Sequence, residues 1–153
     1  MTSTTQANLE AIQSWAAANA YPTNMVGERV EVEVPNNNTK ITANFFTLSS
    51  GVVLLITLDL GAEQPKIEEI GMVTMAINNK MPFGNFDIQF PEGKVAFLRI
   101  STIIDSAPSE SMLDSMVRWA GHSISKYSSI LTVVAQGLID PQTAIQRLND
   151  IDK

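Results

Sequence analysis

The strict alternation of residues 29–34 is the feature that most constrains how this chain can fold. In the run Arg29–Val34 every second residue is valine, and the residues between the valines are arginine or glutamate. In an extended chain successive side chains point to opposite faces, so the valines share one face and the charges the other. A period of two with this contrast is typical of a half-buried strand. The fold must therefore contain a sheet whose apolar face is covered by other elements.

Two further strands are predicted after an asparagine-rich turn at Pro35–Thr39. They span Ile41–Leu48 and Gly51–Leu60, and serine and glycine residues join them. The second of these strands is apolar at every position from Val52 to Ile56, which is typical of a strand that is central in a sheet or covered on both faces.

A hairpin is the clearest local motif. Apolar residues alternate with Asp87 and Gln89, the segment Pro91–Lys94 supplies turn residues, and an apolar strand, Val95–Ile104, returns. Strand periodicity then predicts that the two polar residues point away from a sheet face that buries Phe86, Ile88 and Phe90.

Four segments carry apolar residues at helical spacing. Local signals mark their ends, because Pro22 follows the first, Ser109 can cap the third and Asp140 can cap the fourth. The hydroxyl-rich stretch Ser123–Ser129 leaves open whether the third segment is one helix or two. The predicted helices are Thr5–Ala20, Gln64–Asn79, Glu110–Gln136 and Pro141–Asp150.

The predicted order of elements is therefore α-β-β-β-α-β-β-α-α. This order indicates an α+β fold in which helices pack on a five-stranded antiparallel sheet. A chain of 153 residues is the usual size of one domain, so we expect residues 1–153 to form a single domain.

The composition narrows the possible partners. The chain has a formal net charge of −6, and its isoelectric point is about 4.6. An acidic protein gains nothing from a phosphate backbone or an anionic membrane, so we expect neither nucleic acid nor a membrane as a partner. Only 17% of the residues are charged and 44% are hydrophobic. A monomer would expose much apolar surface, which favours a homodimer or a protein client.

The chain contains no cysteine, which excludes disulfides and thiolate metal sites and gives no sign of an oxidising compartment. The segment Met1–Glu10 has no basic residue and no apolar core of a signal peptide. The longest unbroken apolar run, Val52–Ile56, is far too short to span a membrane. We therefore expect a cytoplasmic protein.

No catalytic constellation is apparent in the sequence. The single histidine, His122, has no second histidine or cysteine with which to bind a metal, and we interpret it as a structural or surface residue. Glu31 and Glu33 could chelate a cation, but the solvated side of an edge strand explains them more simply. The segment Glu92–Val95 lacks the glycine spacing and the hydroxyl residue of a phosphate-binding loop. We therefore predict no cofactor, no metal and no enzymatic activity.

Three residues are candidates for binding a partner: Met72 and Met75 on the second predicted helix, and Phe83 just beyond it. Methionine is flexible and polarizable, which suits a surface that binds varied protein segments. The same residues at helical spacing could instead fill the core or form a dimer contact, and these alternatives stay open. Gly71 and Gly121 lie inside predicted helices, where such residues often permit the close approach of a helix or a subunit.

Most of the chain resembles the YbjN-like family, since the order of predicted helices and strands also fits. The resemblance rests on the strand Asn85–Phe90, the Pro91–Lys94 turn, the returning strand Val95–Ile100 and a long helix that closes at Ala135–Gly137. These proteins are similar in fold to the class I chaperones of type III secretion. The resemblance implies a small acidic α/β sandwich, often dimeric, that binds protein and does not turn over a substrate. It carries no functional residue across, and the helix ending at Asp150 looks like an addition to the secretion-chaperone pattern.

Our leading hypothesis is a non-enzymatic, dimeric protein-binding module that is chaperone-like or regulatory. The alternative is a small-molecule-sensing regulatory domain that uses a groove between sheet and helices. A closed cavity with polar groups would favour the alternative, and an open apolar patch would favour protein binding.

Overall fold

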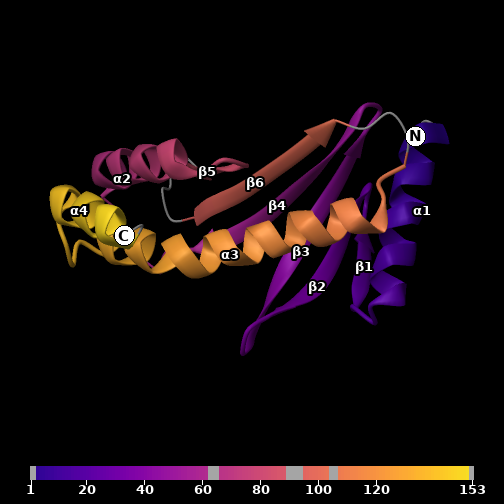
Figure 1. The fold of residues 1–153 in the computed structure, drawn as a ribbon, viewed down its shortest axis with the longest axis horizontal. Helices are drawn as coiled ribbons and strands as arrows, with labels where there is room; N and C mark the ends of the chain where they lie inside the picture. The colour runs from indigo at the N-terminus through magenta and orange to yellow at the C-terminus, as the bar shows by residue number, and fades with distance from the viewer. Residues whose placement is uncertain (1–2, 62–65, 89–94, 104–106, 152–153) are drawn as a thin grey trace. The chain divides into compact units, whose positions relative to one another are not determined.

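The computed structural model describes residues 3–61, 66–88, 95–103 and 107–151. It shows helices combined with one sheet whose strands differ in length (Figure 1). The α+β prediction is confirmed, and each predicted helix and strand has a counterpart. The elements are α1 Ser3–Ala18, β1 Thr23–Val26, β2 Arg29–Asn36, β3 Thr39–Leu48, β4 Gly51–Asp59, α2 Ile67–Lys80, β5 Asn85–Ile88, β6 Val95–Ile103, α3 Glu110–Ala135 and α4 Pro141–Ile151.

The sheet has the strand order β1-β2-β3-β4-β6-β5, which is one strand more than the five that the sequence predicts. The additional strand is β1, and all four of its residues are exposed. The ladders β1–β2, β2–β3 and β3–β4 are antiparallel, with Val32 opposite Ala43 and Phe45 opposite Leu54. Strand β2 lies between β1 and β3, so the interpretation of Glu31 and Glu33 as part of an edge strand is wrong.

The alternation in β2 has the expected consequence. Its valines are buried, whereas Arg29, Glu31 and Glu33 on the other face are half-buried. The charges on that face form ion pairs, with 3.0 Å between Arg29 Nη2 and Glu31 Oε1 and 3.4 Å between Lys40 Nζ and Glu33 Oε2. In β4, Val52, Leu54 and Ile56 are buried and the residues between them are half-buried, which fits a strand inside the sheet.

The chain forms two compact units, each assembled from two stretches of sequence. The first unit contains residues 1–56 and 99–122. In this unit α1 packs against β2 and β3. The ring of Trp15 lies edge-on to the rings of Tyr21 and Phe45, with centroid distances of 5.5 and 5.8 Å. The indole Nε1 of Trp15 donates a hydrogen bond of 2.8 Å to Asp114 Oδ1, which ties α1 to the first half of α3.

The second unit contains residues 57–98 and 123–153. In this unit α2 packs against α4 and β5, and Figure 1 shows α2 and α4 side by side. Phe86 on β5 is buried and lies edge-on to Tyr127, with 6.2 Å between the ring centroids. The predicted burial of Phe86 is confirmed, but Ile88 and Asp87 are both half-buried. Gln89, Phe90 and the Pro91–Lys94 turn lie outside the described residues.

Helix α3 is one continuous helix, which answers the question left open by its serine-rich middle. Ser109 caps it as predicted, since the Ser109 Oγ accepts a hydrogen bond of 3.1 Å from the Met112 backbone N–H. At the other end Gly137 has a φ of +73°, and the Leu138 N–H donates to the Val133 carbonyl. This arrangement is the glycine-ended cap that the sequence indicates.

Candidate functional site

The solvent-facing side of α2 carries two of the three candidate residues. The buried residues of this helix are Ile70, Val73, Thr74 and Ile77. At 100° per residue, Met72 and Met75 lie on the opposite side of the helix from this buried stripe. Their exposed fractions are 52% and 66%. The alternative that they fill the core of this chain is therefore wrong, and the alternatives of partner contact and dimer contact remain.

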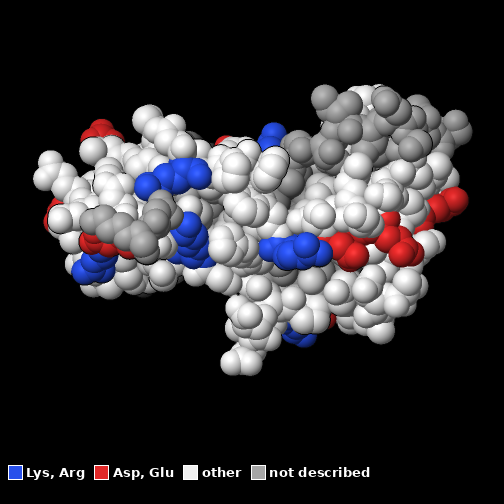
Figure 2. Space-filling model, viewed as in Figure 1, with Lys and Arg blue, Asp and Glu red and all other residues white. Residues whose placement is uncertain are grey.

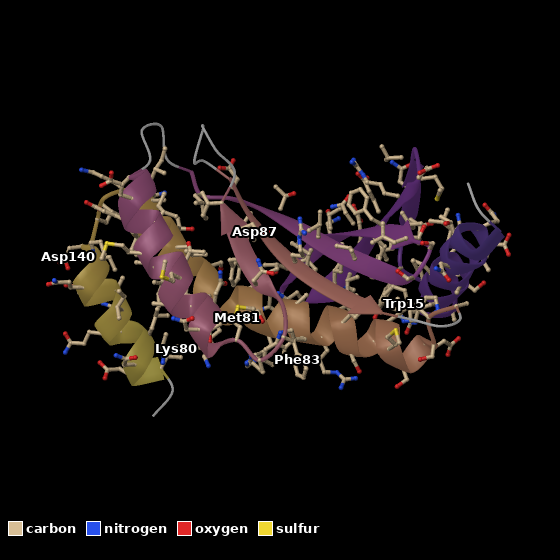
Figure 3. The ribbon with its side chains drawn as sticks, turned by 90° about the horizontal axis from the view of Figure 1, so that it is seen from above. Trp15, Lys80, Met81, Phe83, Asp87 and Asp140 are labelled. Atoms are coloured by element: carbon tan, nitrogen blue, oxygen red, sulfur yellow. The ribbon has the colours of Figure 1, made fainter. Side chains whose placement is uncertain are left out.

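Phe83 lies on the segment that leaves α2. Met81 ends the helix in an extended conformation and is buried, whereas Phe83 two residues later is 65% exposed. Figure 3 shows Lys80, Met81 and Phe83 around this end of the helix. The structure thus places Met72 and Met75 one turn apart on α2 and Phe83 beyond its end. We call these three residues the α2 surface.

The two helical glycines differ in what surrounds them. A Cβ atom added to Gly121 would lie 2.8 Å from the side-chain Oδ1 of Asn36, so the chain itself approaches this position closely. A Cβ atom added to Gly71 would meet no atom within 4 Å. At Gly121 the predicted close approach is therefore made by Asn36 of the same chain. Beside Gly71 no atom of the described chain occupies the space.

An open hollow with a volume of about 390 Å³ lies where α2 and α4 begin. Its polar lining comes from Lys66, Glu69, Asp140 and Thr143, and the segment 137–139 completes it. The hollow is open to solvent and is not the closed cavity that a typical small-molecule site needs.

The carboxylate of Asp140 is engaged in capping α4, as the sequence predicts (Figure 3). Its Oδ1 accepts a hydrogen bond of 2.9 Å from the Thr143 backbone N–H, and its Oδ2 accepts one of 2.7 Å from the Thr143 hydroxyl. These hydrogen bonds stabilise the ionised form and lower the pKa of Asp140 below 3.8. Thr143 thus occupies one acceptor position on each oxygen of this carboxylate.

The residues that were weighed for catalysis or metal binding do not come together. His122 is exposed, and its ring lies 5.5 Å from that of Trp119. Glu31 and Glu33 each face a cationic side chain. The described part of the chain holds no group of three or more His, Asp or Glu residues placed to bind a metal ion. Within these same residues, no helix combines the length and the apolar character needed to cross a membrane.

Sequence reasoning missed the contact between Asn78 on α2 and Phe86 on β5. The Asn78 Nδ2 donates to the Phe86 carbonyl over 3.0 Å, and the Asn78 Oδ1 accepts from the Phe86 N–H over 2.8 Å. No signal in the sequence marks this pair, because an asparagine near a helix end has many possible roles.

Comparison with known proteins identifies the family. The family model for YbjN, described as "putative bacterial sensory transduction regulator", matches residues 8–130. A crystal structure of YbjN from E. coli, described as "a putative transcription regulator", is similar with a TM-score of 0.58 and 12% sequence identity. The match covers 94% of this chain and 93% of that one. Comparison with curated protein sequences gave no significant match.

The matched range contains α2 and the α2 surface but ends before α4. The structural similarity to the E. coli protein extends over nearly the whole of both chains, and at 12% identity it bears on the fold alone. The predicted likeness to YbjN is confirmed, whereas the likeness to secretion chaperones stays a prediction. This chain belongs to the YbjN family.

Proposed function

We propose that the chain is a non-enzymatic regulatory protein that binds segments of another protein through the α2 surface. The observation that carries this proposal is the position of Met72 and Met75 in the middle of the solvent-facing side of α2. The family description as a regulator supports the regulatory part of the proposal. More specifically, we propose that this activity is chaperone-like, so that the bound client is extended or partly unfolded.

The chemistry of the α2 surface suits such a role. When a partner covers exposed methionine side chains, the complex is stabilised by about 25 cal/mol per Å² of apolar area removed from water. Their three rotatable bonds allow them to repack around different partner side chains. The polar neighbours Glu68 and Asn79 lie on the same side of α2 and provide the rim of the contact.

The double variant Met72→Gln and Met75→Gln tests the surface directly. We expect its free energy of unfolding to stay within about 0.5 kcal/mol of the wild type, because both side chains are exposed. We expect partner capture from the native cell lysate to fall at least about tenfold, since a binding hot spot contributes about 2 kcal/mol or more. Urea denaturation and quantitative affinity capture measure the two quantities separately.

The matched control is the double variant Gln142→Ala and Gln146→Ala, which alters two exposed positions one turn apart on α4. This control should leave both stability and capture unchanged. Undiminished capture by the methionine variant, with fold and association state intact, would show that the α2 surface is the wrong site.

Replacement of Gly71 by alanine gives a second test, in which stability and binding should change in opposite directions. An alanine there has room for its Cβ and a better helix propensity, so the free energy of unfolding should rise by about 0.5–1 kcal/mol. A partner that packs closely against α2 beside Gly71 would lose affinity. Gly121→Ala is the comparison, because its added Cβ would meet Asn36 and offset the gain. A Gly71→Ala protein that is less stable than the wild type would contradict the open surroundings of this residue.

Self-association is a further part of the proposal, and we expect a homodimer. Large apolar side chains are exposed in both units, and most of the face drawn in Figure 2 carries neither acidic nor basic side chains. Burying part of this surface between two copies would remove it from water. Sedimentation equilibrium at micromolar concentration should give twice 16.7 kDa. A mass of 16.7 kDa across the concentration range would reject the dimer.

A small-molecule sensor is the second candidate function, and the hollow beside Lys66, Glu69 and Asp140 is the observation that favours it. It ranks second because the hollow is open. Native mass spectrometry after a gentle purification decides between the two candidates. A retained metabolite together with no captured protein would favour sensing.

A further inference from the structure

The two edges of the sheet differ in how they are protected. At the β5 edge the Asn78 side chain forms hydrogen bonds with both the N–H and the C=O of Phe86. A neighbouring antiparallel strand would engage one residue through the same two groups. Since both groups of a strand residue point the same way, Asn78 occupies the side of Phe86 that faces away from β6. The side chain therefore blocks the addition of a strand at this position.

The β1 edge has no such protection among the described residues. In the β1–β2 register Pro22 lies opposite Glu33, and the Glu33 N–H donates to the Pro22 carbonyl over 2.9 Å. Pairs that exchange hydrogen bonds alternate with pairs that do not, so Asn24 and Val26 also bond to β2. The backbone N–H and C=O groups of Thr23 and Met25 therefore point to the open edge.

The sequence of β1 also lacks the features that usually protect an edge. Residues 22–27 contain no charged side chain, and the only proline precedes the strand. Two of the four strand residues are apolar and exposed, with Met25 exposed by 44% and Val26 by 38%. Natural edge strands are commonly protected by lysine, by proline or by a covering element. An edge that offers four free backbone groups beside apolar side chains is suited to pairing with another strand.

The charges near β1 indicate which kind of strand fits. Asn24 lies opposite Glu31 and Pro22 opposite Glu33, while Glu28 is exposed in the turn between β1 and β2. Arg29 and Lys40 balance the charges of Glu31 and Glu33, so the net negative charge among these residues comes from Glu28 in the turn. The whole chain carries a net charge of −6. An added strand that carries lysine or arginine would be attracted by Glu28 and by the net negative charge of the chain.

We propose that β1 is an acceptor edge that binds an extended, basic segment of a partner protein as an additional strand. A second copy of this chain fits less well, because a contact of four residues per copy is far smaller than the roughly 1,200 Å² that a stable dimer buries. Two copies would also bring equal net negative charges together. This edge lies in the first unit and the α2 surface in the second, so each proposal can fail without the other.

Synthetic nonapeptides provide the test. One peptide alternates lysine with valine, and its counterpart has glutamate at each lysine position. We expect the lysine peptide to slow hydrogen exchange at the Thr23 and Met25 amides at least tenfold, and the glutamate peptide to leave exchange unchanged. Methylation of those backbone amide nitrogens of the lysine peptide that point towards β1 should abolish this protection. Methylation of the alternate amides, which point away from β1, should preserve it.

A pair of variants tests the edge from the side of the protein. Met25→Pro removes one outward N–H without disturbing the β1–β2 hydrogen bonds, because Met25 does not bond to β2. It should weaken binding of the fluorescein-labelled lysine peptide at least tenfold, measured by anisotropy. Met25→Ala keeps the N–H and should weaken binding by no more than a few-fold. If Met25→Pro fails to fold, the methylated peptides still decide the question on the wild-type chain.

Three outcomes would overturn the proposal. The first is equal binding of the lysine and glutamate peptides, and the second is protection that appears only at amides outside β1. The third is slow exchange of the Thr23 and Met25 amides that depends on protein concentration without any peptide. That last result would assign the edge to a second copy of the chain.

Discussion

Replacement of Trp15 by alanine is expected to lower the free energy of unfolding by about 3–5 kcal/mol, the range for removing a buried aromatic ring. Trp15 is 1% exposed, and two aromatic rings lie edge-on to it. The change would leave a cavity between α1 and the β2–β3 face and would also remove the hydrogen bond to Asp114. Urea denaturation followed by circular dichroism measures the loss.

Two control variants separate packing from hydrogen bonding. Trp15→Phe keeps most of the ring contacts but leaves the half-buried Asp114 without its donor, so it should cost about 1–3 kcal/mol. Met112→Ala alters a half-buried residue two positions before Asp114 on α3 and should cost less than the alanine variant at Trp15. A loss below about 1 kcal/mol for Trp15→Ala would contradict the placement of this ring in the core.

The parts of the fold that follow from burial could be predicted from the sequence. The valines of β2 alternate with charged residues, and this contrast exists because one face of β2 is covered and the other is not. The helices were likewise predicted from apolar periodicity, and Ser109 and Asp140 act as the caps that their positions indicate. Each of these signals is local, so it can be recognised in the sequence without knowledge of the tertiary contacts.

Strand β1 could not be predicted because it buries nothing. All four of its residues are exposed, so no apolar period marks it, and only its pairing with β2 makes it a strand. The omission of β1 also caused the error about β2, which would be an edge strand if β1 were absent. Edge elements depend on backbone hydrogen bonds, and these leave little trace in a sequence.

The sequence alone leaves undecided whether Met72 and Met75 are exposed or buried, but helix geometry explains why they are exposed. Met72 and Met75 lie two and five positions after Ile70, which places both far from the direction of Ile70 at 100° per residue. The apolar stripe therefore excludes them, although they are apolar themselves. What no pattern could supply is the empty space beside Gly71, since that depends on every neighbouring element.

Replacement of Asn78 by alanine is the second prediction with a large expected effect. It would remove both hydrogen bonds to Phe86, whose backbone groups lie in a part-buried position. Each buried group left unpaired costs about 1–3 kcal/mol, so the loss of both partners should lower the free energy of unfolding by about 2–6 kcal/mol. Asn79→Ala is the matched control, because Asn79 is the exposed neighbour on the same helix. It should change stability by less than about 0.5 kcal/mol.

The alanine variant should have a second effect that the control does not share. With Asn78 gone, the N–H and C=O of Phe86 would be free to pair with a strand from another molecule, so aggregation should increase with protein concentration. Light scattering of the folded protein at several concentrations measures this effect.

The variant Asn78→Asp separates the two hydrogen bonds, since it keeps an acceptor for the Phe86 N–H but sets a carboxylate oxygen against the Phe86 carbonyl. It should be less stable than the wild type, with the N–H still occupied. A variant at Asn78 that loses stability without associating would show that Asn78 only ties α2 to β5. Unchanged stability in the alanine variant would contradict the two hydrogen bonds themselves.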